Sequence, residues 1–217
     1  MSPTSTMIAT GAAGYLLGVL TLWLVTHRLH SQLSCARAAL LRDPLTGLRN
    51  RTGLIAGHHD LARSGHALMT LLIDVDGFKA VNDTYGHQTG DGLLTAFAAR
   101  LTELTDLYGG VAARLGGDEF AVLIPANEHD PIRIAEAVHA VVCQPVTTAA
   151  LTLSVSASIG YTVGSADLSA SLHAADIAMY HAKQSGNGLA TAYRPDMPMP
   201  VRRPHQRRHL RDRGVTE

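Results

Sequence analysis

The sequence predicts an α+β fold, in which a central, mainly antiparallel sheet is flanked by helices and preceded by one transmembrane helix. Three observations predict it. Apolar residues recur at helical spacing in some segments and alternate or run continuously in others, so helices and strands are both present. These elements follow each other irregularly around one hairpin, residues 109–124, which favours antiparallel pairing. Residues 7–26 form one uncharged run near the N-terminus.

The uncharged run "MIATGAAGYLLGVLTLWLVT" is long enough to cross a hydrocarbon core of about 30 Å as a helix. No Lys or Arg precedes it, whereas Arg28, Arg37 and Arg42 follow it, which places its C-terminal side in the cytoplasm. We therefore expect residues 1–27 to be a single-pass anchor in the inner (cytoplasmic) membrane, spanning it with about residues 7–26. A signal peptide and a buried core helix are the alternatives.

Residues 28–42 are expected to form a juxtamembrane signalling helix that pairs with a second copy. Its apolar residues recur at spacings of four, three and four, as on the contact face of a coiled coil: Leu29, Leu33, Ala36 and Leu40. Within the anchor, Gly14 and Gly18 form the G-x-x-x-G spacing that lets two membrane helices approach closely. Apolar helices also contain glycines without pairing, so a dimer contact is one of two interpretations.

The domain itself is expected over residues 43–193. Pro44 and Gly47 in "RDPLTGLRNR" end the preceding helix. Periodicity then predicts helices at residues 51–65, 89–104, 131–142 and 171–184. Continuous or alternating apolar residues predict, besides the hairpin, strands at residues 67–76, 151–163 and 189–193.

Composition limits the partners and describes the C-terminus. Eighteen basic and eighteen acidic residues balance, which argues against general nucleic-acid binding. The two cysteines have no metal-ligand spacing. Residues 194–217 are rich in proline and arginine and have little to bury, so we expect a disordered basic tail. It is either simply solvated or in contact with anionic membrane-lipid headgroups.

Carboxylates gather where the predicted strands end. Asp74 and Asp76 close a buried strand, and Asp118 and Glu119 lie at the hairpin tip. A carboxylate at the end of a buried strand is costly unless something compensates it. Asp76 alone has a second interpretation, as a cap of the following turn. The set as a whole suits Mg²⁺, which binds oxygen ligands and often bridges substrate phosphates.

Glycines accompany these carboxylates. Gly116 and Gly117 allow positive φ in the hairpin turn and remove Cβ atoms that would block a ligand. Further glycines follow the first strand, where backbone N–H groups can cradle phosphate: Gly77, Gly86, Gly90 and Gly92. Any one of them is explained as an ordinary turn glycine, whereas the set favours a phosphate site.

Five motifs in order make this sequence resemble the GGDEF-domain diguanylate cyclases, over residues 43 to about 190: "DPLTGLRNR", "DVDGFKAVNDTYGHQTGD", "RLGGDEF", "SASIGYT" and "ADIAMYHAK". The resemblance implies a fold like the palm of nucleotide polymerases and class III cyclases. It also implies a nucleotidyltransferase that joins two GTP into cyclic di-GMP and releases two pyrophosphates. Because each domain holds one GTP, the reaction requires a homodimer with two GGDEF domains facing each other.

The resemblance also assigns roles to residues. Mg²⁺ or Mn²⁺ is expected on the carboxylates of Asp74 and Asp118 and the carbonyl of Val75. Glu119 is expected to bind a second metal or to activate the attacking 3′-hydroxyl, and either Asp118 or Glu119 is the catalytic base. The substrate is expected to contact seven residues, of which Asn82 and Asp91 read the guanine edge and the others face the phosphates: Gly77, Phe78, Asn82, Asp91, Gly116, Gly117 and Lys183.

Two positions depart from the family pattern. Asn187 stands where a phosphate-binding arginine is expected, which weakens triphosphate binding by about 1 to 3 kcal/mol if that arginine makes a charged hydrogen bond. The R-x-x-D product-inhibition motif is replaced by Leu107, Tyr108, Gly109 and Gly110, so we expect no inhibitory site. A catalytically weak GTP-binding signalling module and a cyclase with altered base choice are the alternative functions.

Overall fold

Strand β1 (Leu68–Val75) lies third in a five-stranded sheet with the order β2–β3–β1–β6–β7. It pairs antiparallel with β3 (Glu119–Pro125) and with β6 (Ala157–Val163), and β3 pairs antiparallel with β2 (Val111–Gly116). Among the strands of this sheet in the described residues, β7 (Thr191–Ala192) alone is parallel to its neighbour, β6. The sheet is therefore mixed but mainly antiparallel, as the sequence predicts.

The computed structural model describes residues 20–31, 39–126, 129–147, 151–164, 167–186 and 190–200. The chain divides into two compact units between Arg42 and Asp43. In the first unit, residues 20–31 are helical and their large apolar side chains are more than half exposed. No helix in the described ranges is long and apolar enough to cross a membrane. Most of the span expected at residues 7–26, and residues 32–38 of the juxtamembrane helix, lie outside the described residues.

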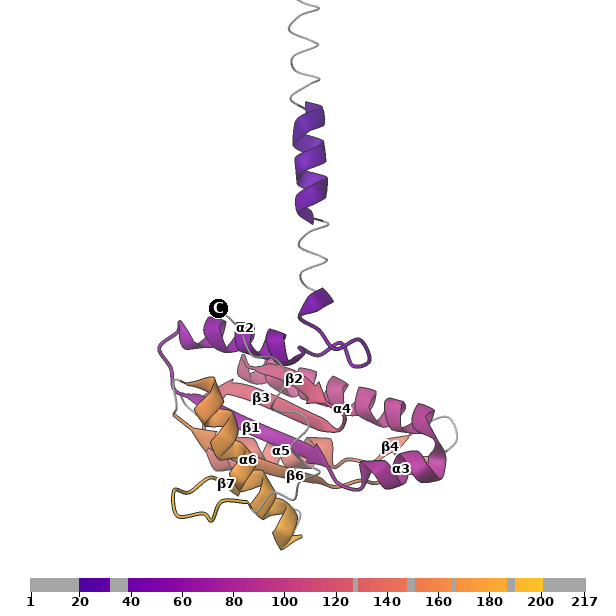
Figure 1. The fold of residues 1–217 in the computed structure, drawn as a ribbon, viewed down its shortest axis with the longest axis vertical. Coiled ribbons are helices and arrows are strands. Elements are labelled where there is room, and N and C mark those ends of the chain that lie inside the picture. The colour runs from indigo at the N-terminus through magenta and orange to yellow at the C-terminus, as the bar shows by residue number, and fades with distance from the viewer. Residues whose placement is uncertain are drawn as a thin grey trace, which may run out of the picture. The chain divides into compact units, whose positions relative to one another are not determined.

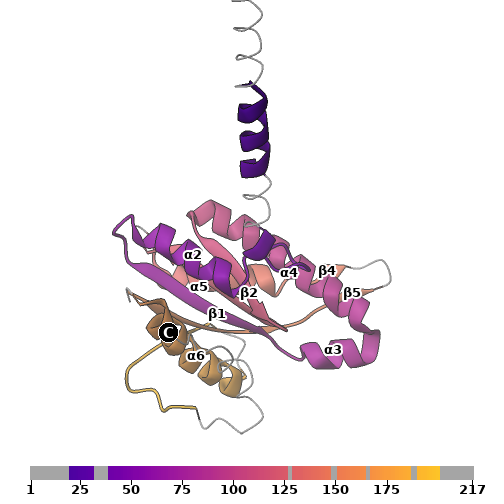
Figure 2. The same ribbon diagram turned by 45° about the horizontal axis from the view of Figure 1, so that its top comes forward.

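Helices cover both faces of the sheet in the second unit (Figures 1 and 2). Two helices, α4 (His87–Tyr108) and α5 (Pro131–Val142), pack on one face with the larger apolar core. Two others, α2 (Arg51–Ala62) and α6 (Leu168–Ser185), pack on the opposite face with a smaller core. Because successive side chains of a strand point to opposite faces, β1 is buried on both sides, which explains its continuous apolar run.

Two expected elements differ from the observed ones. The predicted strand at residues 151–163 is wrong in its first half, because β5 (Thr152–Leu153) pairs with β4 (Val146–Thr147) in a separate small sheet and β6 begins at Ala157. A short helix, α3 (Phe78–Tyr85), was not expected from periodicity, since only Val81 within it is buried. Both differences lie next to the carboxylates at the end of β1.

Helix starts follow ordinary capping chemistry. Asn50 caps α2 by accepting a hydrogen bond from the Gly53 N–H at 2.9 Å, and Asp130 caps α5 with Pro131 at the first helical position. Asp167 caps α6 by accepting from the Ser169 N–H at 3.0 Å. These caps fix where α2, α5 and α6 begin against the sheet.

Gly160 allows α6 to lie directly on β6. A Cβ atom at this position would stand 2.0 Å from the Met179 backbone nitrogen and 2.2 Å from the Ala175 carbonyl oxygen. Such contact with backbone cannot be relieved by a side-chain rotation, so only glycine permits the packing. The close approach fixes the height of α6 above the strand ends, and Lys183 is in its last turn.

The chain after α6 returns to the domain before the basic tail. The Tyr193 N–H donates to the Tyr161 carbonyl at 2.7 Å, and the Pro198 carbonyl oxygen lies 3.0 Å from His181 Nε2. The predicted tail begins at residue 194, but its arginine-rich part, residues 201–217, lies outside the described residues.

Candidate active site

The predicted carboxylates meet where β1 ends. In the strand register Asp74 lies opposite Glu119 on β3 and opposite Ser158 on β6. The Val75 N–H donates to the Asp118 carbonyl at 3.2 Å, so the tip of the β2–β3 hairpin lies beside the next residue of β1. Phe120 is fully buried, with its ring centroid 6.1 Å from that of Phe97 on α4, which holds β3 in place next to Glu119.

Lys183 reaches this edge from α6. Its Nζ lies 2.5 Å from Asp74 Oδ1, with the Asp74 side chain 13% exposed and that of Lys183 51% exposed. Burial raises the pKa of Asp74; the charges of Asp118 and Asp76 raise it further, and Lys183 offsets this only in part. Burial alone lowers the pKa of Lys183, but the hydrogen bond and charge of Asp74 and the charges of Asp76 and Asp118 raise it overall. The lysine is therefore an ammonium at the centre of an acidic group of side chains.

Asp76 does not cap the turn that follows β1. The N-cap of α3 is Gly77, and no described side chain caps that helix. The carboxylate of Asp76 instead accepts hydrogen bonds from Ser156 and Ser158, each at 2.8 Å. These two serines lie at and just before the start of β6, and nothing in the sequence analysis assigned them a role.

The donor set fits a hard divalent cation that also binds substrate. No group of three or more His, Cys, Asp or Glu side chains in the described parts of the chain is placed to hold a metal. Mg²⁺ does not require such a group, because it is commonly held by one or two carboxylates, waters and substrate phosphates. That limited set is available from Asp74, Asp118 and the nearby Val75 backbone. The negative charges of Asp74 and Asp118 are close enough to repel each other, and a cation would relieve this repulsion. Glu119, opposite Asp74, can add a further carboxylate.

The hairpin turn adopts the conformation that its glycines allow. Gly116 has φ 151° and Gly117 has φ 55°, both in the positive range that favours glycine. No described atom lies within 4 Å of where a Cβ would stand at either position, so the turn faces open space. Room for a ligand beside the turn, as predicted, is thus present.

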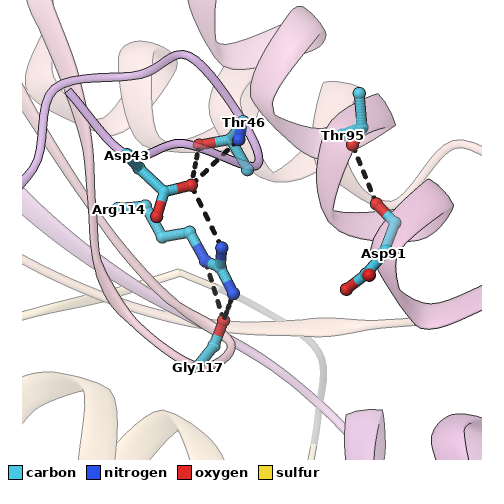
Figure 3. Close-up of polar contacts among 6 residues, drawn as sticks. All are labelled: Asp43, Thr46, Asp91, Thr95, Arg114 and Gly117. Atoms are coloured by element: carbon cyan, nitrogen blue, oxygen red, sulfur yellow. Dashed lines mark hydrogen bonds and ion pairs between the residues drawn. The ribbon is translucent and has the colours of Figure 1, made fainter. Parts of the chain in front are cut away.

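Two residues that the sequence analysis quoted only within motifs hold this turn (Figure 3). Arg114 donates to the Gly117 carbonyl from Nε at 2.9 Å and from Nη2 at 2.7 Å, and its Nη1 lies 3.0 Å from Asp43 Oδ1. Asp43 also accepts from the N–H and hydroxyl of Thr46. Burial opposes the charge of Asp43, but the Thr46 and Arg114 contacts outweigh it and lower the pKa of the carboxyl. The first residue of the domain is thereby tied to the hairpin turn.

The turn between β1 and α3 leads directly into a helix N-terminus. Gly77 is left-handed, with φ 69°, and is followed directly by the first residue of α3, Phe78. The first N–H groups of a helix have no partner within the helix, and no described side chain caps α3. The N–H groups at the start of α3 therefore have no helical partner, and the phosphate contact at Gly77 and Phe78 stays a prediction.

The predicted base-reading residues lie on two consecutive helices. Asn82 on α3 has a buried side-chain oxygen with no hydrogen-bond partner among the described residues. A Cβ at Gly90 on α4 would lie 2.0 Å from that oxygen, so glycine is needed there for Asn82 to occupy its position. Asp91 is exposed in the first turns of α4; its carbonyl accepts from the Thr95 hydroxyl at 2.8 Å, while its carboxylate points away from Thr95 (Figure 3).

Of the two departures from the family pattern, the structure describes residues 107–110 but not Asn187. Leu107 is 78% exposed at the end of α4, and Gly109 is its left-handed C-cap. A Cβ at Gly110 would lie 2.5 Å from the Leu123 carbonyl oxygen, so the backbone leaves no room for the aspartate of an R-x-x-D motif. Asn187 lies outside the described residues.

Comparison with known proteins identifies the family of this fold. The family profile described as "Diguanylate cyclase, GGDEF domain" matches residues 40–188. The solved GGDEF domain of TpbB (YfiN) from Pseudomonas aeruginosa superposes with a TM-score of 0.61 at 36% identity, covering 70% of this chain and 94% of that chain. The mixed sheet and its glycine-containing hairpin therefore define a GGDEF domain. The chain belongs to the diguanylate cyclase GGDEF-domain family.

Curated relatives include both named and uncharacterised proteins. An uncharacterised 19.3 kDa protein of Streptomyces ambofaciens is 40% identical over 67% of this chain and 80% of its own length. The probable diguanylate cyclase DgcF of Escherichia coli K12 is 34% identical over 70% of this chain. The chain spans 51% of the length of DgcF and 22% of the length of an uncharacterised signalling protein of Caulobacter vibrioides that is 35% identical.

Proposed function

We propose that this chain is a diguanylate cyclase that condenses two GTP molecules into cyclic di-GMP and two pyrophosphates. The observation that carries the proposal is the placement of Asp74, Glu119 and the Asp118 backbone together at the end of β1, with Lys183 paired to Asp74. Relatives named diguanylate cyclase support it, among them DgcP of Pseudomonas aeruginosa at 36% identity over 72% of this chain.

Each half-reaction joins the 3′-oxygen of one GTP to the α-phosphorus of the other and breaks the bond from that phosphorus to pyrophosphate. The hydroxyl proton passes to a carboxylate, for which Asp118 and Glu119 are the candidates. Lys183 and the N–H groups at Gly77 and Phe78 hold the phosphates, since phosphoryl transfer depends mainly on positioning and charge neutralisation. A bound Mg²⁺ or Mn²⁺ would neutralise charge on the triphosphate and lower the pKa of the hydroxyl.

Guanine is favoured over adenine by the acceptors on α3 and α4. The buried oxygen of Asn82 lacks a donor among the described residues, and the Asp91 carboxylate is exposed. Guanine offers a ring N–H and an amino group on the edge that these acceptors can meet, whereas adenine presents a ring acceptor in place of that N–H. Leaving a buried acceptor unpaired costs about 1 to 3 kcal/mol, which is enough to disfavour ATP.

Homodimerisation and membrane anchoring are parts of the same proposal. Two bonds must form between two bound nucleotides, so two GGDEF domains must face each other, with the juxtamembrane helix and anchor bringing the copies together. The uncharged run at residues 7–26 and the arginines after it support an anchor in the inner membrane with the domain in the cytoplasm. The anchor is the part that would contact membrane lipid.

The full chain, incubated with GTP and Mg²⁺ and assayed by chromatography, tests the proposal. We expect cyclic di-GMP from the unaltered chain, about 10³-fold less from Asp118→Ala, and no corresponding product from ATP. Product from ATP would instead indicate altered base choice. A chain that binds GTP but makes no product at high concentration would be a GTP-binding signalling module, the function that Asn187 in place of a phosphate-binding arginine favours.

A further inference from the structure

Asp76 is tied to the start of β6 by three hydrogen bonds. Its Oδ2 accepts from the Ser156 hydroxyl and its Oδ1 from the Ser158 hydroxyl, each at 2.8 Å. Its N–H donates to the Ser156 carbonyl at 3.0 Å. We call Asp76, Ser156 and Ser158 the serine clamp.

The usual roles of such an aspartate do not account for the serine clamp. Asp76 does not cap α3, whose N-cap is Gly77, and among the described residues it forms no ion pair. Both Asp76 carboxylate oxygens accept serine hydroxyls, whereas Asp74 accepts from Lys183 through Oδ1. Burying part of a carboxylate against neutral donors costs free energy. That cost suggests that Asp76 has a role beyond joining the two strands.

The serine clamp continues the β1–β6 connection into the turn. The paired register of the two strands ends at Val75 opposite Ala157. The clamp ties the next residue, Asp76, to the same segment of β6, so the direction in which the chain leaves β1 is fixed. The turn that starts there carries the Val75 backbone, the left-handed Gly77 and the first residue of α3, Phe78.

We propose that Asp76 is a positioning residue, and that the serine clamp holds the turn from Val75 to Phe78 in the geometry that receives the triphosphate. The inference rests on the proposed function. It assigns Asp76 no contact with substrate or metal: Asp76 acts through the backbone of the residues beside it. Reacting groups displaced by about 1 Å lose about 100-fold in rate, so a turn that moves by less still costs turnover.

The test uses the full chain and three variants. Ser156→Ala/Ser158→Ala removes both donors and keeps the charge of Asp76. Asp76→Asn removes the charge but can exchange hydrogen bonds with hydroxyls that rotate. Ser154→Ala, at an exposed position of the same segment, is the matched control. Turnover of GTP and amide hydrogen exchange at Val75 and Asp76 are measured for each.

We expect the double serine variant to lose about tenfold in kcat and several-fold in GTP affinity, because the displaced turn carries the Gly77 and Phe78 N–H groups proposed to hold the phosphates. Exchange at Val75 and Asp76 should accelerate, because their N–H groups bond to the Asp118 and Ser156 carbonyls, while Ile73 within β1 stays protected. Asp76→Asn should lose less in kcat than the double variant, and Ser154→Ala should match the unaltered chain.

Three results would overturn the inference. One is a kcat within twofold of the unaltered chain for the double serine variant, while the unaltered chain makes product. Another is faster exchange along all of β1, which indicates general destabilisation. The third is a larger loss in Asp76→Asn than in the double variant, which would assign the role to charge. If the unaltered chain makes no product, the proposed function fails, and exchange at Val75 and Asp76 alone decides whether the serine clamp holds the turn.

Discussion

Two turns border the candidate site, and each is held by an aspartate in a different way. The β2–β3 turn is held by Arg114, which donates to the Gly117 carbonyl and pairs with Asp43. The β1–α3 turn is held by Asp76 through two serine hydroxyls. Both aspartates bridge segments more than seventy residues apart in the chain, by 71 residues for Asp43 and by 80 and 82 for Asp76.

The difference between the turns concerns charge. The charge of Asp43 is compensated by Arg114, so the β2–β3 turn is anchored without adding net charge to the site. Asp76 accepts hydrogen bonds from neutral serine hydroxyls, which do not neutralise its charge. This negative charge helps to raise the pKa of both Asp74 and Lys183. The β2–β3 turn is therefore held by an ion pair, whereas the β1–α3 turn is held by a carboxylate whose charge adds a small contribution, after that of burial, to the raised pKa of Asp74.

The largest effect is expected at the tip of the β2–β3 turn. Asp118→Ala should lower cyclic di-GMP formation by about 10³-fold, because a carboxylate proposed to bind metal or accept the proton is removed. Asp118→Asn keeps the shape and should lose nearly as much. Chromatographic assay of product checks both, and thermal melting should show little change. Activity within tenfold of the unaltered chain in Asp118→Asn would remove Asp118 from the chemistry.

A smaller effect, mainly on stability, is expected from the anchor of the same turn. Arg114→Ala leaves Asp43, with a side chain 19% exposed, without its partner and should lower the free energy of unfolding by about 2 kcal/mol. Ser156→Ala/Ser158→Ala should cost less stability, about 1 kcal/mol in all, because Ser156 is exposed and water can replace its hydroxyl at the Asp76 carboxylate. Urea unfolding of both variants measures the difference.

A double-mutant cycle isolates the ion pair. Arg114→Ala, Asp43→Asn and the combined variant give a coupling energy, which we expect to be about 1 kcal/mol and favourable. A coupling near zero would mean that Arg114 stabilises the turn through the Gly117 carbonyl alone. In that case the contrast in charge between the two turns would lose its thermodynamic support.

The sequence predicted the parts of this arrangement that depend on local pattern. The unbroken apolar run predicted strand β1, and the glycines at 116 and 117 predicted the hairpin turn, whereas the expectation that Asp74 and Asp118 share a site rested on the family resemblance. The helix α3 was missed because it is eight residues long, lies between two glycines and buries only Val81. The contacts Asp43–Arg114 and Asp76–Ser158 join residues distant in sequence, and no periodicity carries that information. The available signal for these contacts was that charged and hydroxyl residues stand within the quoted motifs.

The loss of stability at low pH should reveal the contribution of the Asp43 carboxylate. The pKa of Asp43 is lowered in the folded state, so its contribution is present above its ordinary value, near 3.8, and is lost as pH falls through the lower folded value. Asp43→Asn should therefore flatten the loss of stability below about pH 4. Urea unfolding from pH 2 to pH 6 measures it. An equally steep acid limb in the variant would show that Asp43 titrates alike in both states.

The smallest effect is expected at residues 107–110, just before β2, where we predict no change in the binding of cyclic di-GMP. In R-x-x-D proteins the product binds just before β2, but here Gly110 has no room for a side chain, because a Cβ would lie 2.5 Å from the Leu123 carbonyl. Leu107→Arg alone should therefore leave cyclic di-GMP binding and inhibition unchanged, within twofold. Leu107→Arg/Gly110→Asp should not create tight binding either, and should unfold more easily, because relieving the contact requires a shift of backbone on β3. Equilibrium binding of cyclic di-GMP to both variants and to the unaltered chain measures this. Tight binding of cyclic di-GMP to the double variant would mean that the backbone at Gly110 shifts readily to admit a side chain. The site would then be absent because Arg and Asp are missing at 107 and 110, and not because space is lacking before β2.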